Sequence, residues 1–253
     1  MERFDNKVVV VTGASQGLGY HTAKAYIDLG AKVIMTARTA EKLESAAKAM
    51  GSANAYAFPM DVSVEADWQR LVAYIKENFG QIDVLVNCAA IVPGIDILHM
   101  DFDLFKKVCA INMDSVFLGM KYCYEVIKKG VYSSIINISS VGGLKGGPGG
   151  SGDAGYNASK AAVRNLTKHA SYVFAPDCVR VVSVHPSGIN TPMREEYIKN
   201  HPEAVGPGAA RNPLPPHCTQ PEDLAQIIVF LSSAPAKTIT GSEILVDCGQ
   251  MAI

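Results

Sequence analysis

The chain has 253 residues, of which 48% are hydrophobic and 19% are charged. This length suits one α/β domain, residues 1–253, with a large buried core. Lys and Arg (23) nearly balance Asp and Glu (24), which leaves a formal net charge of −1. Electrostatics therefore gives no reason to expect binding to nucleic acid or to an anionic membrane.

The first predicted elements are a strand, a glycine-rich loop and a helix. A β-branched run at residues 8–11 is typical of a strand buried on both faces. A helical pattern over 17–29 and a second strand at 32–36 follow the loop, which predicts a mononucleotide-binding βαβ unit. Glycines let a pyrophosphate approach the backbone, and the helix N-terminus offers free N–H groups to it. The expected cofactor residues in this loop are Gly13, Ser15, Gln16, Gly17, Leu18 and Gly19.

The end of the second strand indicates which dinucleotide binds. An NAD-binding chain usually places Asp or Glu there to meet the ribose 2′-hydroxyl. Here the segment is Met35-Thr36-Ala37-Arg38-Thr39, and no acid occurs before Glu41. The planar guanidinium of Arg38 can bind a 2′-phosphate, so NADP(H) is favoured over NAD(H). The alternative is that Arg38 is a solvated residue at the start of the next helix.

Strand and helix patterns alternate along the rest of the chain. Such alternation predicts an α/β fold, a doubly wound parallel sheet (Rossmann fold) of about seven strands with helices on both faces. The predicted strands are 8–12, 32–36, 55–59, 84–87, 134–138, 179–184 and 244–246. The predicted helices are 17–29, 40–50, 66–79, 103–129, 156–175 and 221–232.

Two regions interrupt this regularity. Residues 142–155 are crowded with glycine, and residues 188–216 are rich in Pro, Gly and Asn. Both begin at the carboxyl ends of predicted strands, where open α/β sheets bind their ligands. The second region holds a short helical piece near 193–200, and we expect it to form a lid over the substrate.

A tyrosine and a lysine lie four residues apart in Tyr156-Asn157-Ala158-Ser159-Lys160. On a helix they share one face. A nearby Lys160 cation favours the phenolate, so we expect a pKa of Tyr156 lowered toward neutral. Such a phenol can donate a proton to a carbonyl oxygen or accept one from an alcohol. The alternative is a solvated helix face.

Taken together and in order, these motifs resemble those of the short-chain dehydrogenase/reductase family over essentially the whole chain. The further matching segments are Asp61-Val62, Asn87-Cys88-Ala89-Ala90, Asn112, Ser139-Ser140, Pro186-Ser187-Gly188-Ile189-Asn190-Thr191 and Val246-Asp247-Cys248-Gly249. The resemblance implies that the cofactor also contacts Asp61, Val62, Asn87, Ala89, Tyr156, Lys160, Gly188, Ile189 and Thr191.

The resemblance implies four catalytic residues, Asn112, Ser140, Tyr156 and Lys160. Tyr156 is the general acid and base, and Lys160 lowers its pKa and holds the nicotinamide ribose. Ser140 bonds the substrate oxygen, and Asn112 carries a proton-relay water to Lys160. Simpler alternatives remain for two of the matched residues. Asn112 could be a helix-surface amide, and Asp61 could cap a turn. For Ser139 a strand-end hydroxyl satisfied by backbone is expected.

The chain departs from the family pattern in the Pro186–Thr191 segment, where Ser187 shifts the usual small-residue pattern, and at three further places. Cys88 and Ala90 replace the usual Asn and Gly after the fourth strand. The interval from Ser140 to Tyr156 is longer than in most members of the family, and the added length falls in 142–155. We expect this loop to bulge outward, so that Ser140 and Tyr156 still meet, and to affect the choice of substrate.

The expected activity is an NADP(H)-dependent interconversion of a ketone and a secondary alcohol. Apolar residues near the expected pocket favour a steroid, terpenoid or alicyclic ketone: Ile91, Val92, Leu144, Ile189 and Met193. One alternative is a 3-oxoacyl thioester reductase, and another is a catalytically silent dinucleotide-sensing scaffold. The resemblance also implies a homotetramer or homodimer, joined through helices 103–129 and 156–175.

Cysteine and histidine usage completes the expectations. The six cysteines form no C-x-x-C pair and, with the six histidines, no zinc-site spacing. Reduced thiols in a cytoplasmic protein without a bound metal are expected. No signal peptide is expected before the first strand, and no apolar stretch approaches the length of a membrane span. The expected partner is a small-molecule substrate, without nucleic acid or membrane.

Overall fold

The first strand shows how the sequence pattern builds the core. In the computed structural model, which describes residues 2–127, 132–146, 152–200 and 212–252, strand β1 spans Val8–Thr12. All five of its residues are buried. Side chains alternate across a strand, so Val9 and Val11 pack into the core on one face, and Val8 and Val10 into that on the other. Burial on both faces explains why the run is continuously apolar.

Seven parallel strands form one sheet in the order β3-β2-β1-β4-β5-β6-β7. The doubly wound parallel sheet predicted from the sequence is therefore confirmed. The strand order reverses direction between β1 and β4, and such a switch point opens a crevice at the carboxyl ends of the strands. The remaining strands are β2 Lys32–Ala37, β3 Ala55–Pro59, β4 Val84–Asn87, β5 Ser134–Ile138, β6 Arg180–Pro186 and β7 Glu243–Val246.

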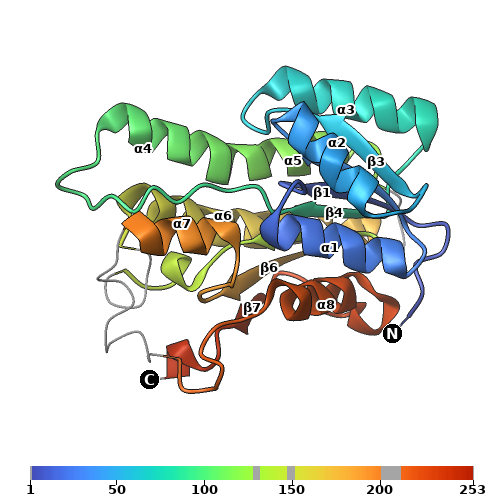
Figure 1. Ribbon diagram of the computed structural model, residues 1–253. Coiled ribbons are helices and arrows are strands. Elements are labelled where there is room, and N and C mark those ends of the chain that lie inside the picture. The colour runs from blue at the N-terminus through green and yellow to red at the C-terminus, as the bar shows by residue number, and fades with distance from the viewer. Residues whose placement is uncertain (1, 128–131, 147–151, 201–211, 253) are drawn as a thin grey trace.

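Helices cover both faces of the sheet (Figure 1). One core holds the apolar sides of α1 (Gly17–Asp28), α2 (Ala40–Ala49) and α8 (Pro221–Ser232). The other holds those of α3 (Glu65–Asn78), α5 (Ser115–Cys123) and α6 (Ala154–Phe174). Among the described residues, no helix is both long enough and apolar enough to cross a membrane.

The single helix predicted over 103–129 is wrong in two respects. The chain forms α4 (Phe102–Cys109), then a π-turn at Ala110–Asp114, and then α5, which ends at Cys123. An apolar pattern does not reveal a π-turn, because the extra residue changes the hydrogen bonding and not the composition. Beyond the end of α5 the chain forms a turn, and Ile127 makes an isolated parallel bridge with Ile82, just before β4. Residues 128 and 129 lie outside the described residues.

Helix α6 begins two residues before the predicted start. Its first residue is Ala154, and the Asp153 side chain caps it by accepting a 2.6 Å hydrogen bond from the Tyr156 N–H. The short helix expected in the lid is present as α7, Pro192–Asn200. The rest of that segment from 201 to 211, and residues 147–151 of the glycine-rich loop, lie outside the described residues.

Candidate active site

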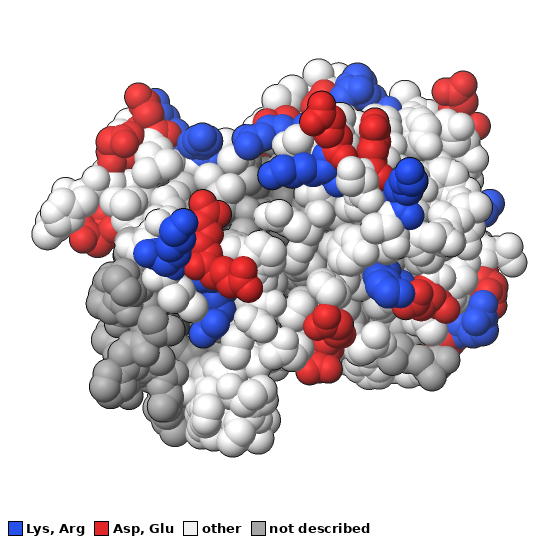
Figure 2. Space-filling model, in the orientation of Figure 1, with Lys and Arg blue, Asp and Glu red and all other residues white. Residues whose placement is uncertain are grey.

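A cleft of about 560 Å³ opens at the carboxyl ends of β1, β2, β4, β5 and β6. Figure 2 shows the surface hollowed in this part of the molecule. Every residue predicted to bind the cofactor lines the cleft except Asn87, and so do three of the four predicted catalytic residues. The exception among the catalytic residues is Asn112. Most of the residues that the sequence predicts for the site therefore lie together in one cleft.

The glycine loop is packed too closely to carry side chains. Gly13 has a φ of +68°, and a Cβ there would lie 2.9 Å from the Cα of Ala89. A Cβ on Gly19 would lie 2.7 Å from the carbonyl carbon of Gly13. Helix α1 starts at Gly17 with no acid in its first turn, and its N-cap Gln16 makes no side-chain capping bond. The first-turn N–H groups can therefore bind a phosphate, and the loop fits a dinucleotide.

Substituting Gly19 tests this close packing. We expect Gly19→Ala to lower the free energy of unfolding by about 1–3 kcal/mol, as overpacking does, and to weaken NADPH binding. Urea unfolding and NADPH fluorescence titration measure the two effects. Gly146→Ala is the matched control, because a Cβ at Gly146 meets nothing within 4 Å. Equal behaviour of the two variants would contradict the expectation.

Two cations lie at the end of the cleft beyond β2. Arg38 was expected there, and Lys42 in the first turn of α2 also lines the cleft. Sequence reasoning missed Lys42, although a second cation close behind Arg38 was a usable signal. Two cations strengthen the electrostatic case for a 2′-phosphate at this end.

Asp61 closes a turn, as one reading of the sequence expects, and its place in the cleft is compatible with the expected cofactor contact. Its Oδ1 accepts hydrogen bonds from the Ser63 N–H at 2.9 Å and from the Ser63 hydroxyl at 2.6 Å, which closes a turn. It also lines the cleft. Burial alone would raise the pKa of Asp61, but the Ser63 hydrogen bonds and the Arg38 charge outweigh burial and lower it. The Asp61 carboxylate is therefore ionised.

Ser140 and Tyr156 lie together at the wall of the cleft, close enough that the Ser140 side chain lowers the pKa of Tyr156. The longer loop between them therefore still brings them together, as expected. The Ser140 Oγ also accepts a 3.0 Å hydrogen bond from the Gly142 N–H, which fixes its position just after β5. The Ser139 hydroxyl instead donates to the backbone carbonyl of Lys160 at 2.8 Å. Ser139 is thus satisfied by backbone, as predicted.

The predicted lowering of the Tyr156 pKa by Lys160 is wrong for this structure. Burial raises the pKa of Tyr156, and Asp153 and Cys88 add to the rise, while only the neighbouring Ser140 side chain lowers it. The Lys160 Nζ lies 5.6 Å from the centre of the Tyr156 ring and donates to the Ile138 carbonyl at 2.7 Å. Lys160 is itself buried, and burial lowers its pKa to about 8. Lys160 therefore stays mostly protonated at pH 7 but loses its proton at a lower pH than an ordinary lysine does.

The lowered pKa of Lys160 predicts a distinct dependence of stability on pH. Between pH 8 and the ordinary lysine pKa of 10.5, the unfolded chain binds a proton at Lys160 that the folded chain does not. Stability therefore rises with pH across this window, and the cost of burying the cation is fully present below it. Relative to Lys160→Met, the wild type should gain on the order of 3 kcal/mol from pH 8 to 10.5.

Urea unfolding of both proteins at several pH values measures this gain. The contribution of the buried Cys123 thiol is present in both proteins and cancels in the comparison, whereas that of Cys88 changes because the Lys160 charge acts on it. Lys168→Met is the matched control, because Lys168 lies on the same helix with a half-exposed side chain paired to Glu243. A parallel pH dependence of wild type and Lys160→Met would contradict the prediction.

Asn87 and Asn112, the two predicted site residues that do not line the cleft, hold neighbouring backbone and strands in place through hydrogen bonds. Asn112 lies in the π-turn and is fully buried, so the helix-surface alternative is wrong. Its side chain accepts from the Ile91 N–H and donates to the Ile91 carbonyl, both at 2.9 Å, and donates to the Ser159 hydroxyl at 3.2 Å. Asn87 donates to the Asn137 Oδ1 at 2.8 Å and so joins β4 to β5.

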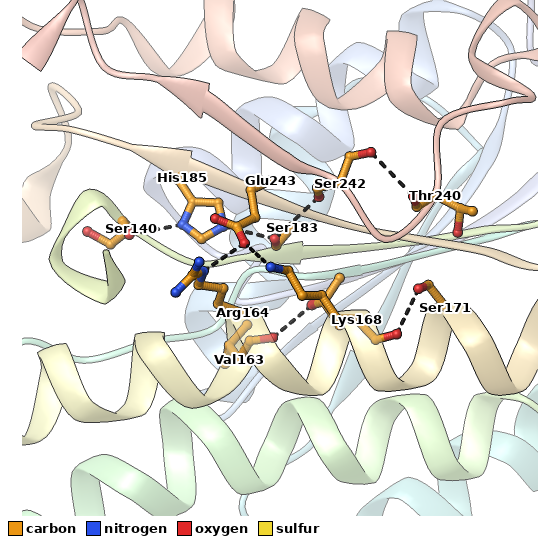
Figure 3. A network of polar contacts seen from close by, with 11 residues as sticks. Ser140, Val163, Arg164, Lys168, Ser171, Ser183, His185, Thr240, Ser242 and Glu243 are labelled. Atoms are coloured by element: carbon orange, nitrogen blue, oxygen red, sulfur yellow. Dashed lines mark hydrogen bonds and ion pairs between the residues drawn. The ribbon is translucent and has the colours of Figure 1, made fainter. Parts of the chain in front are cut away.

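A buried histidine fixes the backbone of Ser140 (Figure 3). Burial lowers the pKa of His185, so its ring is neutral. Its Nδ1–H donates to the Ser140 carbonyl at 3.1 Å, and its Nε2 accepts from the Ser183 hydroxyl at 2.8 Å. Figure 3 also shows Glu243 beside this ring, paired with Arg164 and Lys168 of α6. The network joins β6, β7 and α6 to the backbone of Ser140, which lies just after β5.

The outer part of the cleft is mostly apolar. Ile91, Val92, Ile189 and Met193 line it as predicted, whereas Leu144 does not. Helix α7 also contributes Arg194, Tyr197 and Ile198. The sequence leaves open whether Tyr197 is a pocket wall or a core residue of the short helix, and it does not assign Arg194 or Ile198 to the pocket. The spacing of Arg194, Tyr197 and Ile198 at three and four residues was the signal for one shared helix face.

Comparisons with known proteins agree with this geometry. A family model described as Enoyl-(Acyl carrier protein) reductase matches residues 13–251. The chain is 36% identical to the NADP-dependent (R)-specific alcohol dehydrogenase of Lentilactobacillus kefiri, with 99% of each chain covered. It is 34% identical to the cyclopentanol dehydrogenase of Comamonas testosteroni over the full length of both. The crystal structure of a short-chain dehydrogenase/reductase, named glucose/ribitol dehydrogenase, from Brucella melitensis superposes with a TM-score of 0.90 at 31% identity, covering 99% of each chain.

Proposed function

The chain belongs to the short-chain dehydrogenase/reductase family, and from this premise we propose that it interconverts an apolar ketone and a secondary alcohol with NADP(H). It is an oxidoreductase acting on CH–OH and C=O groups, as its alcohol dehydrogenase relatives are named. One observation carries the proposal. The side chains of Ser140 and Tyr156 lie together in the same cleft as the glycine loop, with buried Lys160 one helical turn further on.

Each of these residues has a defined task in the proposed reaction. The nicotinamide ring carries the hydride. The Ser140 hydroxyl donates a hydrogen bond to the substrate oxygen and stabilises the negative charge that develops there. Tyr156 gives its phenolic proton to that oxygen in reduction and takes it back in oxidation. The Lys160 Nζ, which donates a hydrogen bond to the Ile138 carbonyl, supplies a second proton donor near Tyr156.

The raised pKa of Tyr156 supports reduction as the direction favoured at neutral pH. A general acid must be protonated before the reaction, and burial keeps the Tyr156 phenol in that form. Oxidation of the alcohol requires the phenolate, so it should need an alkaline solution.

The cofactor preference for NADP(H) over NAD(H) rests on charge. Arg38 and Lys42 line the ribose end of the cleft, and the segment from Met35 to Thr39 carries no acid that would repel a 2′-phosphate. The name of the Lentilactobacillus kefiri relative, an NADP-dependent enzyme, supports the same choice.

The substrate class is an apolar ketone such as an alicyclic, terpenoid or steroid ketone. Apolar side chains from the segment after β4 and from α7 make up the outer wall of the cleft, and the Comamonas relative is named for an alicyclic alcohol. One observation favours a 3-oxoacyl thioester instead. Arg194 lines the cleft and Lys199 is exposed on the same helix, so α7 could contact an acidic carrier.

The test is NADPH oxidation with a panel of cyclic ketones, acetoacetyl thioesters and sugars. We expect turnover of the cyclic ketones, at least about tenfold above the other classes in kcat/KM. Preferential turnover of thioesters would select the alternative substrate. NADPH binding without turnover of any class would favour a dinucleotide-sensing scaffold on the same fold.

We propose further that the protein is a homo-oligomer, dimer or tetramer, joined through α4, α5 and α6. Apolar side chains are exposed on these helices: Phe102, Phe117, Tyr172 and Val173. Sedimentation velocity measures the state, and a monomer at micromolar concentration would contradict the proposal.

A further inference from the structure

Asp153 joins two parts of the active site that are far apart in the sequence. It immediately precedes α6, the helix that carries Tyr156, and its side chain is fully buried. One carboxylate oxygen, Oδ1, accepts from the Tyr156 N–H at 2.6 Å. The other, Oδ2, accepts from the Gly94 N–H at 2.6 Å and the Ile95 N–H at 3.2 Å. The carboxylate thus bridges the catalytic helix and the segment after β4.

The segment from 91 to 95 forms a wall of the cleft and is held from two sides. Its first two residues, Ile91 and Val92, line the cleft. At that end, Asn112 forms the pair of hydrogen bonds to the Ile91 backbone and also contacts Ser159 of α6. At the other end, Asp153 holds Gly94 and Ile95, and the Ile95 carbonyl accepts from the Ala154 N–H at 3.1 Å. Both attachments lead to α6.

We propose that Asp153 is a positioning residue that sets the distance between the substrate-facing segment 91–95 and Tyr156, and so determines how well bulky ketones fit. The inference rests on the proposed function for its substrate. A helix cap needs only one oxygen acceptor, whereas the second oxygen of Asp153 accepts two hydrogen bonds from the segment. Charge-assisted hydrogen bonds of this kind are about twice as strong as neutral ones, which suits a fixed spacing.

The Asp153 charge has a second consequence for Tyr156. A buried carboxylate near the phenol disfavours the phenolate, so removing the charge lowers the pKa of Tyr156. In the oxidation direction, the rise of activity with pH should then begin at lower pH. The other titratable and charged groups around the cleft stay unchanged in such a variant: Lys160, Cys88, Arg194 and Tyr197.

Two substitutions separate positioning from helix capping. Ser and Asn are both good N-caps, so Asp153→Ser and Asp153→Asn keep α6 capped. In Asp153→Ser the single short hydroxyl caps the helix but is too short to reach the segment 91–95 at the same time. In Asp153→Asn the side-chain N–H faces one of the two sets of backbone N–H groups, and no hydrogen bond can form between two donors. Asp101→Asn is the control, because Asp101 caps α4 by accepting from the Leu104 N–H at 2.8 Å but is exposed.

Three readouts decide the proposal. Amide hydrogen exchange at Gly94 and Ile95 should become at least about tenfold faster in both Asp153 variants. The kcat/KM for a bulky cyclic ketone should fall about tenfold or more, and more than for a small ketone, with an unchanged dissociation constant for NADPH. The pH dependence of alcohol oxidation should move to lower pH. Asp101→Asn should change none of these.

The outcomes also separate this inference from the proposed function. Unchanged exchange at Gly94 and Ile95 in both variants would overturn the positioning role, whatever the activity. Faster exchange with wild-type selectivity between bulky and small ketones would also overturn it, since the segment would then move without affecting the substrate. A wild-type protein that reduces no ketone would contradict the proposed function, and the exchange data would still decide whether Asp153 holds the segment.

Discussion

Replacing Tyr156 by Phe should lower kcat by roughly 10²–10⁴-fold, the usual contribution of a general acid. The variant loses only the phenolic hydroxyl group, which is the proton donor in the proposed reaction. In the wild type the neighbouring Ser140 side chain lowers the pKa of this group. The aromatic ring remains to fill its place on α6, so the fold and the glycine loop should be unaffected. Stopped-flow measurement of NADPH oxidation gives kcat, and fluorescence titration gives the dissociation constant for NADPH, which should change little.

Tyr172→Phe is the matched control for this experiment. It removes the same atom from the same helix, but Tyr172 is 83% exposed and lies outside the cleft. Its kcat should equal that of the wild type. Turnover in Tyr156→Phe at more than a tenth of the wild-type rate would remove Tyr156 as the proton donor.

The second large effect is expected at the ribose end of the cleft. In Ala37→Asp with Arg38→Leu, a carboxylate replaces a neutral side chain and the guanidinium is lost. The 2′-phosphate then loses a charge-assisted hydrogen bond and gains a repulsive neighbour, while the free 2′-hydroxyl of NADH gains an acceptor. The ratio of kcat/KM for NADPH to that for NADH should fall by about 10²-fold or more.

A control for the cofactor variant is Arg70→Leu, which removes an arginine of α3 that pairs with Asp67 and does not line the cleft. It should leave the cofactor ratio unchanged. An unaltered preference for NADPH in the double variant would show that Arg38 does not read the 2′-phosphate. Lys42 would then be the next residue to replace.

The parts of the site that depend on local sequence could be predicted. The glycine loop follows from glycine spacing between a buried strand and a helix, and the backbone of Gly13 and Gly19 leaves no room for a Cβ. The spacing of Tyr156 and Lys160 places both on one helix face whatever surrounds them. Such features need only the chain within a few residues of themselves.

The properties that depend on distant contacts could not be predicted. The sequence places Tyr156 and Lys160 on one helix face. Burial by other elements raises the pKa of Tyr156 and lowers that of Lys160, and both shifts favour the neutral form of the side chain. Lys42 reaches the cleft only because α2 packs beside β2. The role of Asp153 requires Gly94, some sixty residues earlier in the chain, to lie beside the start of α6. No pattern along the chain encodes that neighbourhood.

The π-turn at Ala110–Asp114 determines how this part of the chain responds to a change in its length. A π-turn holds one residue more than an uninterrupted α-helix with the same path. Deleting one residue there would restore regular hydrogen bonding and keep α4 and α5 on their present paths, but the widened turn that holds Asn112 against the Ile91 backbone would be lost. Deleting a residue within α4 or α5 would instead rotate the residues beyond it by about 100°. A one-residue deletion should therefore be tolerated better in the π-turn than in either flanking helix, with the Asn112 contact as the part that is lost.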